Sequence, residues 1–225
     1  MIEFHTLPDR HPDLAHSPLL RGALLTLQYA QEHGAIGLTK TSSFKRVFVH
    51  WAVEHFDWPG RSSEEVFRYC KVVNEFEFPP LEVLHYLLNK LRLGRHVKGE
   101  FKLTKRGAEL AQAPGRLFGE LIPFFVLKTD HASYGRFGEN LFGTWDVWLN
   151  IINVEADHGT TERALYAAFY AIAMIGTMMA GERWPRSHPV SCAPWNGRDC
   201  SCRLLRNAMA STCTTYSRPR SGAAP

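Results

Sequence analysis

Residues 81–111 read LEVLHYLLNKLRLGRHVKGEFKLTKRGAELA, and this stretch decides the fold. Its first part places leucines at spacings of three and four, which is the period of one helix face. Its second part has short apolar pieces on both sides of Lys98-Gly99-Glu100, a sequence typical of a tight turn. The order predicts a helix over 81–93, two strands within 94–103 joined by that turn, and another helix after Thr104.

Three more helices and a short strand are predicted before this stretch. Pro18 suits the first turn of a helix because its missing N–H would have no partner there, and an apolar stripe continues to Gly34. Apolar residues recur at helical spacing over 44–56. Serines followed by acids indicate the start of a helix over 62–77. With residues 36–38 as a strand that pairs with the later hairpin, the predicted fold is mainly α with a small three-stranded sheet.

The regions on either side of this core are predicted to differ from it. Residues 1–17 lack an apolar period and are expected to form a flexible arm. Residues 114–182 are expected to form a C-terminal helical extension, in which Pro123 kinks or divides the first helix. Within this extension, residues 164–180 carry no charge but many alanines. That composition favours a buried packing helix over a membrane span.

Residues 183–225 differ in composition from the rest of the chain. They contain seven Arg and no Lys, hold four of the five cysteines, and show no apolar period. Two interpretations are open: a disordered basic arm that contacts nucleic acid or an acidic partner, or the product of out-of-frame translation of a GC-rich gene. The composition favours the second. The formal charge of +4 for the whole chain comes from this segment.

The order helix, short strand, helix, inserted helix, helix and hairpin resembles the winged helix-turn-helix superfamily, and within it uncharacterised bacterial winged-helix proteins. The resemblance covers residues 18–113, with 62–77 as an insertion. Its most specific part is Leu84-x-x-Leu87-Leu88-x-x-Leu91, then Gly94, the turn Lys98-Gly99-Glu100 and Leu103-Thr104-x-x-Gly107. The resemblance implies that helix 81–93 lies in a DNA groove and that hairpin 94–103 is the wing.

Positive charge is concentrated where the wing is predicted. Between Lys90 and Arg106, seven basic residues stand against the single acid Glu100, whereas the remaining residues up to 182 are net acidic. A polyanion would experience the field of such a cluster, so we predict non-catalytic, possibly regulatory, binding of double-stranded DNA. Base edges are the predicted targets of His85, Asn89 and Arg92, and phosphates those of Arg95, Lys98, Lys102 and Lys105, with Lys90 beside them.

The same residues allow a second interpretation. Wings and helix ends are exposed to solvent, and charged residues are common there even where no ligand binds. Under this alternative, the winged-helix scaffold is a protein-interaction adaptor that binds no nucleic acid. The adaptor would use helix 81–93 and the apolar helix Leu165–Met179, and a protein partner or a second copy of the chain in a homodimer would contact the latter.

Signals for catalysis, metals and cofactors are weak. None of the motifs GxGxxG, GxxxxGK[ST], HExxH and GxSxG occurs, so no catalytic residue, metal ligand or cofactor is predicted. His50 and His55 do not share a helix face, and the four cysteines of residues 183–225 lack a CxxC spacing. Cys70 is expected to be a small buried hydrophobe. A single cysteine before residue 183 and the lack of an apolar leader predict a cytoplasmic protein.

Overall fold

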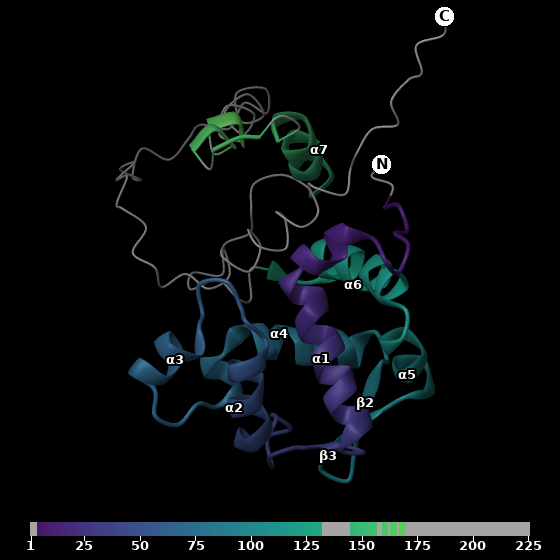
Figure 1. Ribbon diagram of the computed structural model, residues 1–225, viewed down its shortest axis with the longest axis vertical. Coiled ribbons are helices and arrows are strands. Elements are labelled where there is room, and N and C mark those ends of the chain that lie inside the picture. Colours follow the sequence, from purple (N-terminus) through teal and green to yellow (C-terminus); the bar gives the residue numbers. More distant parts are fainter. Residues whose placement is uncertain (1–3, 132–144, 157–158, 162, 166, 170–225) are drawn as a thin grey trace, which may run out of the picture. The chain divides into compact units, whose positions relative to one another are not determined.

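The computed structural model describes residues 4–131, 145–156, 159–161, 163–165 and 167–169 (Figure 1). Contacts divide the chain into two compact units. One extends to Thr129, and the other holds the described residues from Asp130 onward. The first unit contains the three strands and the cationic stretch of the sequence.

Three short strands form one antiparallel sheet in the first unit. They are β1 (Ile36–Gly37), β2 (Gly94–Val97) and β3 (Glu100–Leu103), in the order β1-β3-β2. Lys98 and Gly99 join β2 to β3 with φ angles of 50° and 78°. A two-residue type I′ hairpin turn requires positive φ at both positions. The sheet confirms the predicted fold class, which is mainly α with a small three-stranded sheet.

Six α-helices and two 3-10 helices accompany the sheet in this unit. Ser17 Oγ accepts a hydrogen bond from Leu20 N at 3.3 Å before α1, and Thr104 Oγ1 accepts one from Gly107 N at 3.0 Å before α5. These side chains satisfy N–H groups that have no partner within the helix. Of the two effects predicted for Pro123, a kink or a division, the division does not occur, because α6 continues through this residue. The helices are η1 (Pro12–His16), α1 (Pro18–Glu32), α2 (Arg46–His55), α3 (Ser63–Tyr69), η2 (Glu75–Glu77), α4 (Pro79–Lys90), α5 (Lys105–Ala111) and α6 (Pro114–Lys128).

The core of this unit lies around α1, which contacts α2, α4, α5, α6 and β3. α1 and α4 approach closely at Gly22, where a Cβ would lie 2.6 Å from Leu84 Cδ1. Phe101 of β3 is fully buried, and its ring lies against Gly94 of β2. Burial of apolar surface of this kind is the main favourable contribution to folding.

The segment predicted as one helix over 62–77 is divided, so that prediction is wrong. Ser62 Oγ accepts a hydrogen bond from Glu65 N at 3.2 Å, as expected of a helix cap. However, α3 ends at Tyr69 because Cys70 has extended backbone angles (φ −129°, ψ 105°). A separate short helix, η2, follows. Cys70 is half-buried and is not the core residue that its apolar neighbours predict.

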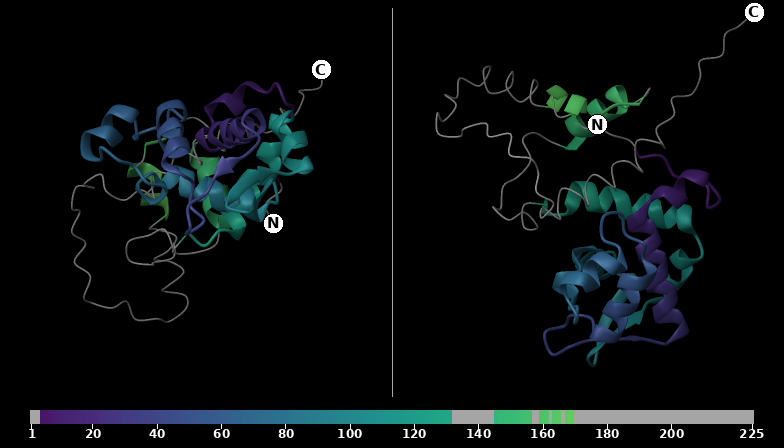
Figure 2. Two further views of the ribbon diagram at one scale, coloured as in Figure 1. Left: turned by 90° about the horizontal axis from the view of Figure 1, so that it is seen from below. Right: turned by 60° about the vertical axis from the view of Figure 1, so that its left-hand side comes forward.

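The part of the N-terminal arm that the structure describes packs against α6, whereas the sequence predicts a flexible arm. Asp9 Oδ1 accepts a hydrogen bond from Gly115 N at 2.9 Å, and a Cβ on Gly115 would lie 2.1 Å from Leu7 O. Leu14 of η1 and the following Ser17 are buried. Figures 1 and 2 show teal α6 beside the purple N-terminal segment. α6 therefore belongs to the first unit and not to a C-terminal extension.

The predicted extension is represented by α7 (Trp145–Glu155) in the second unit. Among the described residues, no helix combines the length and the apolar character needed to cross a membrane. Residues 170–225 lie outside the described residues. The two interpretations of residues 183–225 and most of the predicted contact helix Leu165–Met179 therefore fall outside them as well.

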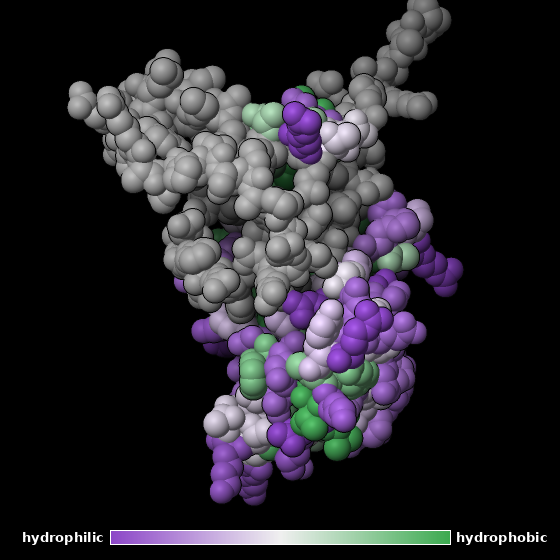
Figure 3. Space-filling model, turned by 90° about the vertical axis from the view of Figure 1, so that its left-hand side faces the viewer, coloured by the Kyte–Doolittle hydropathy of each residue, from purple (hydrophilic) through white to green (hydrophobic). Residues whose placement is uncertain are grey.

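One surface of the first unit exposes large apolar side chains. Val47 of α2, Val72 and Phe76 are 77%, 47% and 67% exposed. Val73 N donates a hydrogen bond to His50 Nε2 at 3.2 Å. This contact holds the segment before η2 beside α2, where Val47 lies one turn before His50. Figure 3 shows hydrophobic residues gathered on the side of the molecule that lies to the left in Figure 1.

Candidate functional site

Arg95 and Lys102 lie side by side on the outer face of the β2-β3 hairpin. They are register partners in the two strands, and residues directly opposite each other in an antiparallel pair point to the same side. Neighbouring positions alternate between faces. His96 and the buried Phe101, which are also register partners, therefore point to the inner face.

Lys45 brings a third cation to this outer face. Gly37 of β1 pairs with Glu100 of β3, on the same side of the sheet as Lys102. A Cβ on Gly37 would lie 2.8 Å from Lys45 Cδ, so the Lys45 side chain runs across the outer face of β1. Lys45 is exposed to solvent. No sequence signal marks it, because its position depends on the pairing of β1 with a strand far along the chain.

The tip of the hairpin adds Lys98, which is exposed at the turn. Leu38 N donates a hydrogen bond to Gly99 O at 2.8 Å, which ties the turn to the end of β1. One acid is present on this surface, because Lys102 Nζ lies 3.1 Å from Glu100 Oε2. Exposed ion pairs of this kind are weak, so the surface remains net positive.

Helix α4 exposes only a narrow stripe. Glu82, Asn89 and Lys90 are exposed and Tyr86 is half-buried, at spacings that define one face. Lys90 Nζ lies 5.6 Å from the centre of the Tyr86 ring, which is the distance of a cation–π contact. Arg92 is exposed just after the helix. Asn89, Lys90 and Arg92 are therefore accessible to a ligand.

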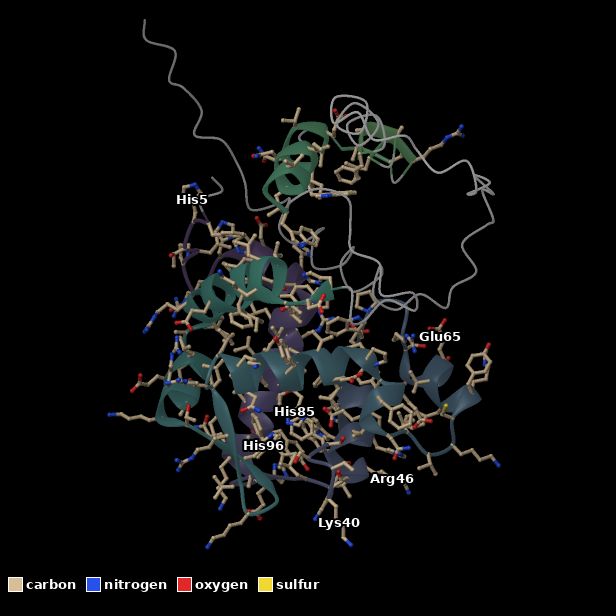
Figure 4. The ribbon with its side chains drawn as sticks, turned by 180° about the vertical axis from the view of Figure 1, so that it is seen from behind. His5, Lys40, Arg46, Glu65, His85 and His96 are labelled. Carbon is tan, nitrogen blue, oxygen red and sulfur yellow. The ribbon has the colours of Figure 1, made fainter. Side chains whose placement is uncertain are left out.

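His85 does not lie on this stripe, and the prediction that it reaches base edges is wrong. Its side chain is buried and stacks on Phe44, with ring centres 3.9 Å apart. Its Nδ1 lies 2.6 Å from Glu75 Oε1, and its Nε2 lies 2.8 Å from His96 Nε2. Figure 4 labels both histidines, which lie close together. Both ring nitrogens of His85 are occupied within the protein and cannot read a base.

Glu75 connects η2 to two other segments. Its carboxylate is buried, with Oε1 facing His85 and Oε2 accepting a hydrogen bond from Phe44 N. A buried charge needs such partners to replace its lost hydration. Burial raises the pKa of the Glu82 carboxyl, and the negative charge of Glu75 adds to this effect. The sequence does not indicate this role for Glu75, because the residue falls within the segment predicted as a continuous helix.

Glu75, His85 and His96 form a row of polar contacts, and His96 is its outer member. Partial burial lowers the pKa of His96 from its ordinary value of 6.5, and the positive charge of His85 lowers it further. The carboxylate of Glu75 opposes these two effects. His96 therefore favours its neutral form more strongly than a histidine in water.

Lys105 and Arg106 begin α5. Of these two residues, Arg106 is held by a hydrogen bond and an ion pair that the structure shows, and Lys105 is not. Lys105 is exposed. Arg106 Nη1 donates to Leu91 O at 3.0 Å, and its Nη2 forms an ion pair with Glu120 of α6. Arg106 therefore holds α5 and α6 together and contributes less to the cationic surface than its charge suggests.

The other candidates considered from sequence serve local contacts. His50 Nε2 accepts the hydrogen bond from Val73 N, and His55 Nδ1 lies 2.7 Å from Trp51 O. The two histidines therefore have separate partners. Within the described ranges, no group of three or more His, Cys, Asp and Glu side chains is arranged to hold a metal ion.

The fold and the site define a mainly α protein with a small sheet that is cationic on its outer face. Comparison with known proteins relates it to a bacterial family. The Y4jL N-terminal domain matches residues 15–116, and the y4jL C-terminal domain matches residues 135–187. The chain is 40% identical over 148 residues to "Uncharacterized protein y4jL" of Sinorhizobium fredii (strain NBRC 101917 / NGR234). That alignment covers 64% of this chain and 66% of the relative.

These matches support a place for the chain in an uncharacterised bacterial protein family with this pair of domains. No solved structure matches the chain.

Proposed function

We propose that the first unit is a winged-helix module that binds double-stranded DNA without catalysis, in a regulatory role. The element order α1, β1, α2, α4, β2, β3 and the sheet order β1-β3-β2 support this proposal. In this arrangement the β2-β3 hairpin corresponds to the wing, and α4 corresponds to the helix that faces a DNA groove. α3 and η2 form an insertion between α2 and α4.

The observation that carries the proposal is the gathering of cations on the outer face of the sheet. Lys45, Arg95 and Lys102 come from three segments, and Lys98 extends the same surface at the turn. Cations held on one surface attract a polyanion more strongly than the same charges scattered over the molecule. Phosphates of the DNA backbone are their natural targets.

Contacts to bases rest on the exposed residues at the end of α4. With His85 buried, Asn89 and Arg92 are the remaining predicted base-reading side chains. Asn pairs favourably with adenine and Arg with guanine in the major groove. Lys90 and Lys105 flank them and would contact phosphates. This distribution, with more phosphate contacts than base contacts, predicts affinity that depends more on salt than on sequence.

A titration of fluorescent duplex DNA at about 50 mM and about 200 mM salt tests the proposal, because phosphate contacts weaken steeply as salt rises. The double variant Lys98→Glu with Lys102→Glu is expected to lose affinity by about tenfold or more. The matched control is Arg68→Glu with Lys71→Glu. These two residues are exposed in or just after α3, and the control makes the same change in net charge.

The control is expected to bind nearly as well as the unmodified chain. Equal losses in both double variants would indicate only a general charge effect. Binding that does not respond to salt, or no binding at either salt concentration, would contradict the proposal.

A protein-interaction adaptor is the second candidate. The exposed apolar side chains of Val47, Val72 and Phe76 favour it, because contiguous apolar surface often marks a contact with another protein. Under this alternative, the charged hairpin is simply solvated. The absence of any DNA binding in the titration would support the adaptor over the DNA-binding role.

A further inference from the structure

Two facing ring nitrogens join helix α4 to the hairpin. His85 Nε2 and His96 Nε2 lie 2.8 Å apart. Each of these atoms is a donor when it carries a proton and an acceptor when it does not. The contact is attractive only when one nitrogen is protonated and the other is not. It therefore depends on how many protons the two imidazoles hold.

Glu75 fixes the role of His85 on the opposite side of its ring. The 2.6 Å distance between His85 Nδ1 and Glu75 Oε1 indicates that Nδ1 carries a hydrogen and donates it to the carboxylate. His85 can donate to this carboxylate either as a neutral ring or as a cation. A neutral His96 can complete the contact in both cases. It donates to a neutral His85, or it accepts from a cationic His85.

A second positive charge on the two rings removes the hydrogen bond between His85 and His96. If both rings are protonated, N–H groups face each other at the contact and no acceptor remains between them. Two like charges at this distance also repel each other. His85 and His96 can therefore stay in contact while they share one positive charge, but not while they carry two.

We propose that Glu75, His85 and His96 form a proton-sensitive latch. The latch holds the β2-β3 hairpin against α4 while the imidazole pair carries at most one positive charge, and it releases the hairpin when both rings are protonated. This property goes beyond DNA binding and does not depend on it.

The surroundings of the latch favour the closed state at neutral pH. Phe44 and Phe101 place uncharged rings against His85, with centres 3.9 Å and 5.7 Å from its own. His85, which these rings cover, is buried, whereas His96 is exposed on its other side. The low dielectric around His85 strengthens its hydrogen bonds. The charged groups on the elements around the pair are Glu75 and Glu77 on η2, Glu82 and Lys90 on α4, and Arg95, Lys98, Glu100 and Lys102 on the hairpin.

The direction of the pH response follows from His96. Its pKa in the folded chain lies below 6.5, since burial and the charge of His85 outweigh the attraction of Glu75. A released or unfolded His96 takes up its proton at about 6.5. The closed state of the latch is therefore fully favoured above pH 6.5. It loses this stability as the pH falls from 6.5 toward the lowered pKa of His96. For one proton, the opening equilibrium rises by up to about tenfold per pH unit below 6.5.

Two measurements on the full chain test the latch. NMR of the histidine ring nitrogens is expected to show that His96 titrates below 6.5. Amide hydrogen exchange, corrected for the intrinsic rate at each pH, is expected to show that β2 opens more readily below 6.5. The expected acceleration is up to about tenfold per pH unit.

The variant His96→Gln separates proton uptake from loss of the contact. Glutamine keeps an N–H donor on a side chain of similar length, but it does not titrate. Its β2 amides are expected to exchange slowly, without the extra acceleration below pH 6.5. The control His33→Gln changes an exposed histidine that stacks on Tyr29 of α1, and it is expected to retain the acceleration.

The same acceleration in the unmodified chain and in His96→Gln would overturn the latch. So would a titration of His96 at or above 6.5, which requires no variant. No nucleic acid is present in either measurement. Failure of the latch is therefore distinguishable from failure of DNA binding.

Discussion

At the scale of single residues, the hairpin depends on the close approach of Gly94 to Phe101. A Cβ on Gly94 would lie 1.9 Å from Phe101 Cζ, and the Phe101 ring is fully buried. Gly119 of α6 is the opposite case, because a Cβ there would meet no atom within 4 Å. The same substitution at the two glycines should therefore have effects of opposite sign.

Gly94→Ala is expected to lower the free energy of unfolding by about 1–3 kcal/mol, because the added methyl group overpacks the core. Gly119→Ala is expected to raise it by about 0.4–1 kcal/mol, because alanine loses less backbone entropy than glycine when a helix forms. Urea unfolding of the two variants measures both changes. Similar changes in the two variants would show that the ring contact at Gly94 does not constrain the hairpin.

This sequence predicts which helix or strand a residue belongs to better than it predicts whether the side chain is buried and what it contacts. Helical spacing is compatible with an exposed His85, but its burial is caused by Glu75 and Phe44, which come from other segments. Lys45 escapes prediction for the same reason. Asn89 and Lys98 are exposed as expected, because the end of a helix and the tip of a hairpin meet solvent in most packing arrangements.

At the scale of elements, α6 is part of the core of the first unit. Leu121 is 0% exposed, whereas Leu127, six residues later in the same helix, is 45% exposed. α6 contacts α1, α4, α5 and η1. One face of α6 therefore stabilises the unit that carries the cationic sheet.

Leu121→Ala is expected to lower the free energy of unfolding by about 2–5 kcal/mol, because it leaves a cavity in the core. Leu127→Ala makes the same chemical change at an exposed position and is expected to cost less than about 1 kcal/mol. Chemical denaturation of both variants provides the comparison. If both variants lose the same small amount, α6 would instead be a weakly attached extension, as the sequence predicts.

Elements with local start and turn signals are predicted correctly, and those that end through contacts with other segments are not. Pro18 lies at the start of α1, Pro79 and Pro80 lie in the first turn of α4, and the Lys98-Gly99 turn fixes the hairpin. The division between α3 and η2 follows from the backbone of Cys70 and from hydrogen bonds of Glu75 to distant partners. Periodicity within 62–77 carries no information about those partners.

At the scale of the whole molecule, family comparison and structure agree on a two-part organisation. The division between the units, after Thr129, falls between the two matched segments, 15–116 and 135–187. The second match ends at residue 187, close to residue 183, where the composition of the chain changes. Positive charge within the first unit gathers on the sheet. The first unit is therefore the part in which DNA binding should be sought.

The most direct test of DNA binding by the outer face of the sheet is the salt dependence of duplex binding by Lys45→Gln. Only the folded arrangement of β1, β3 and β2 places Lys45 on the same face of the sheet as Arg95 and Lys102. Lys71→Gln, which removes an exposed cation elsewhere, is the control. Loss of one phosphate contact predicts that the slope of log affinity against log salt falls in magnitude by about one in Lys45→Gln, with no change in the control. An unchanged slope in a correctly folded Lys45→Gln would contradict binding by this face.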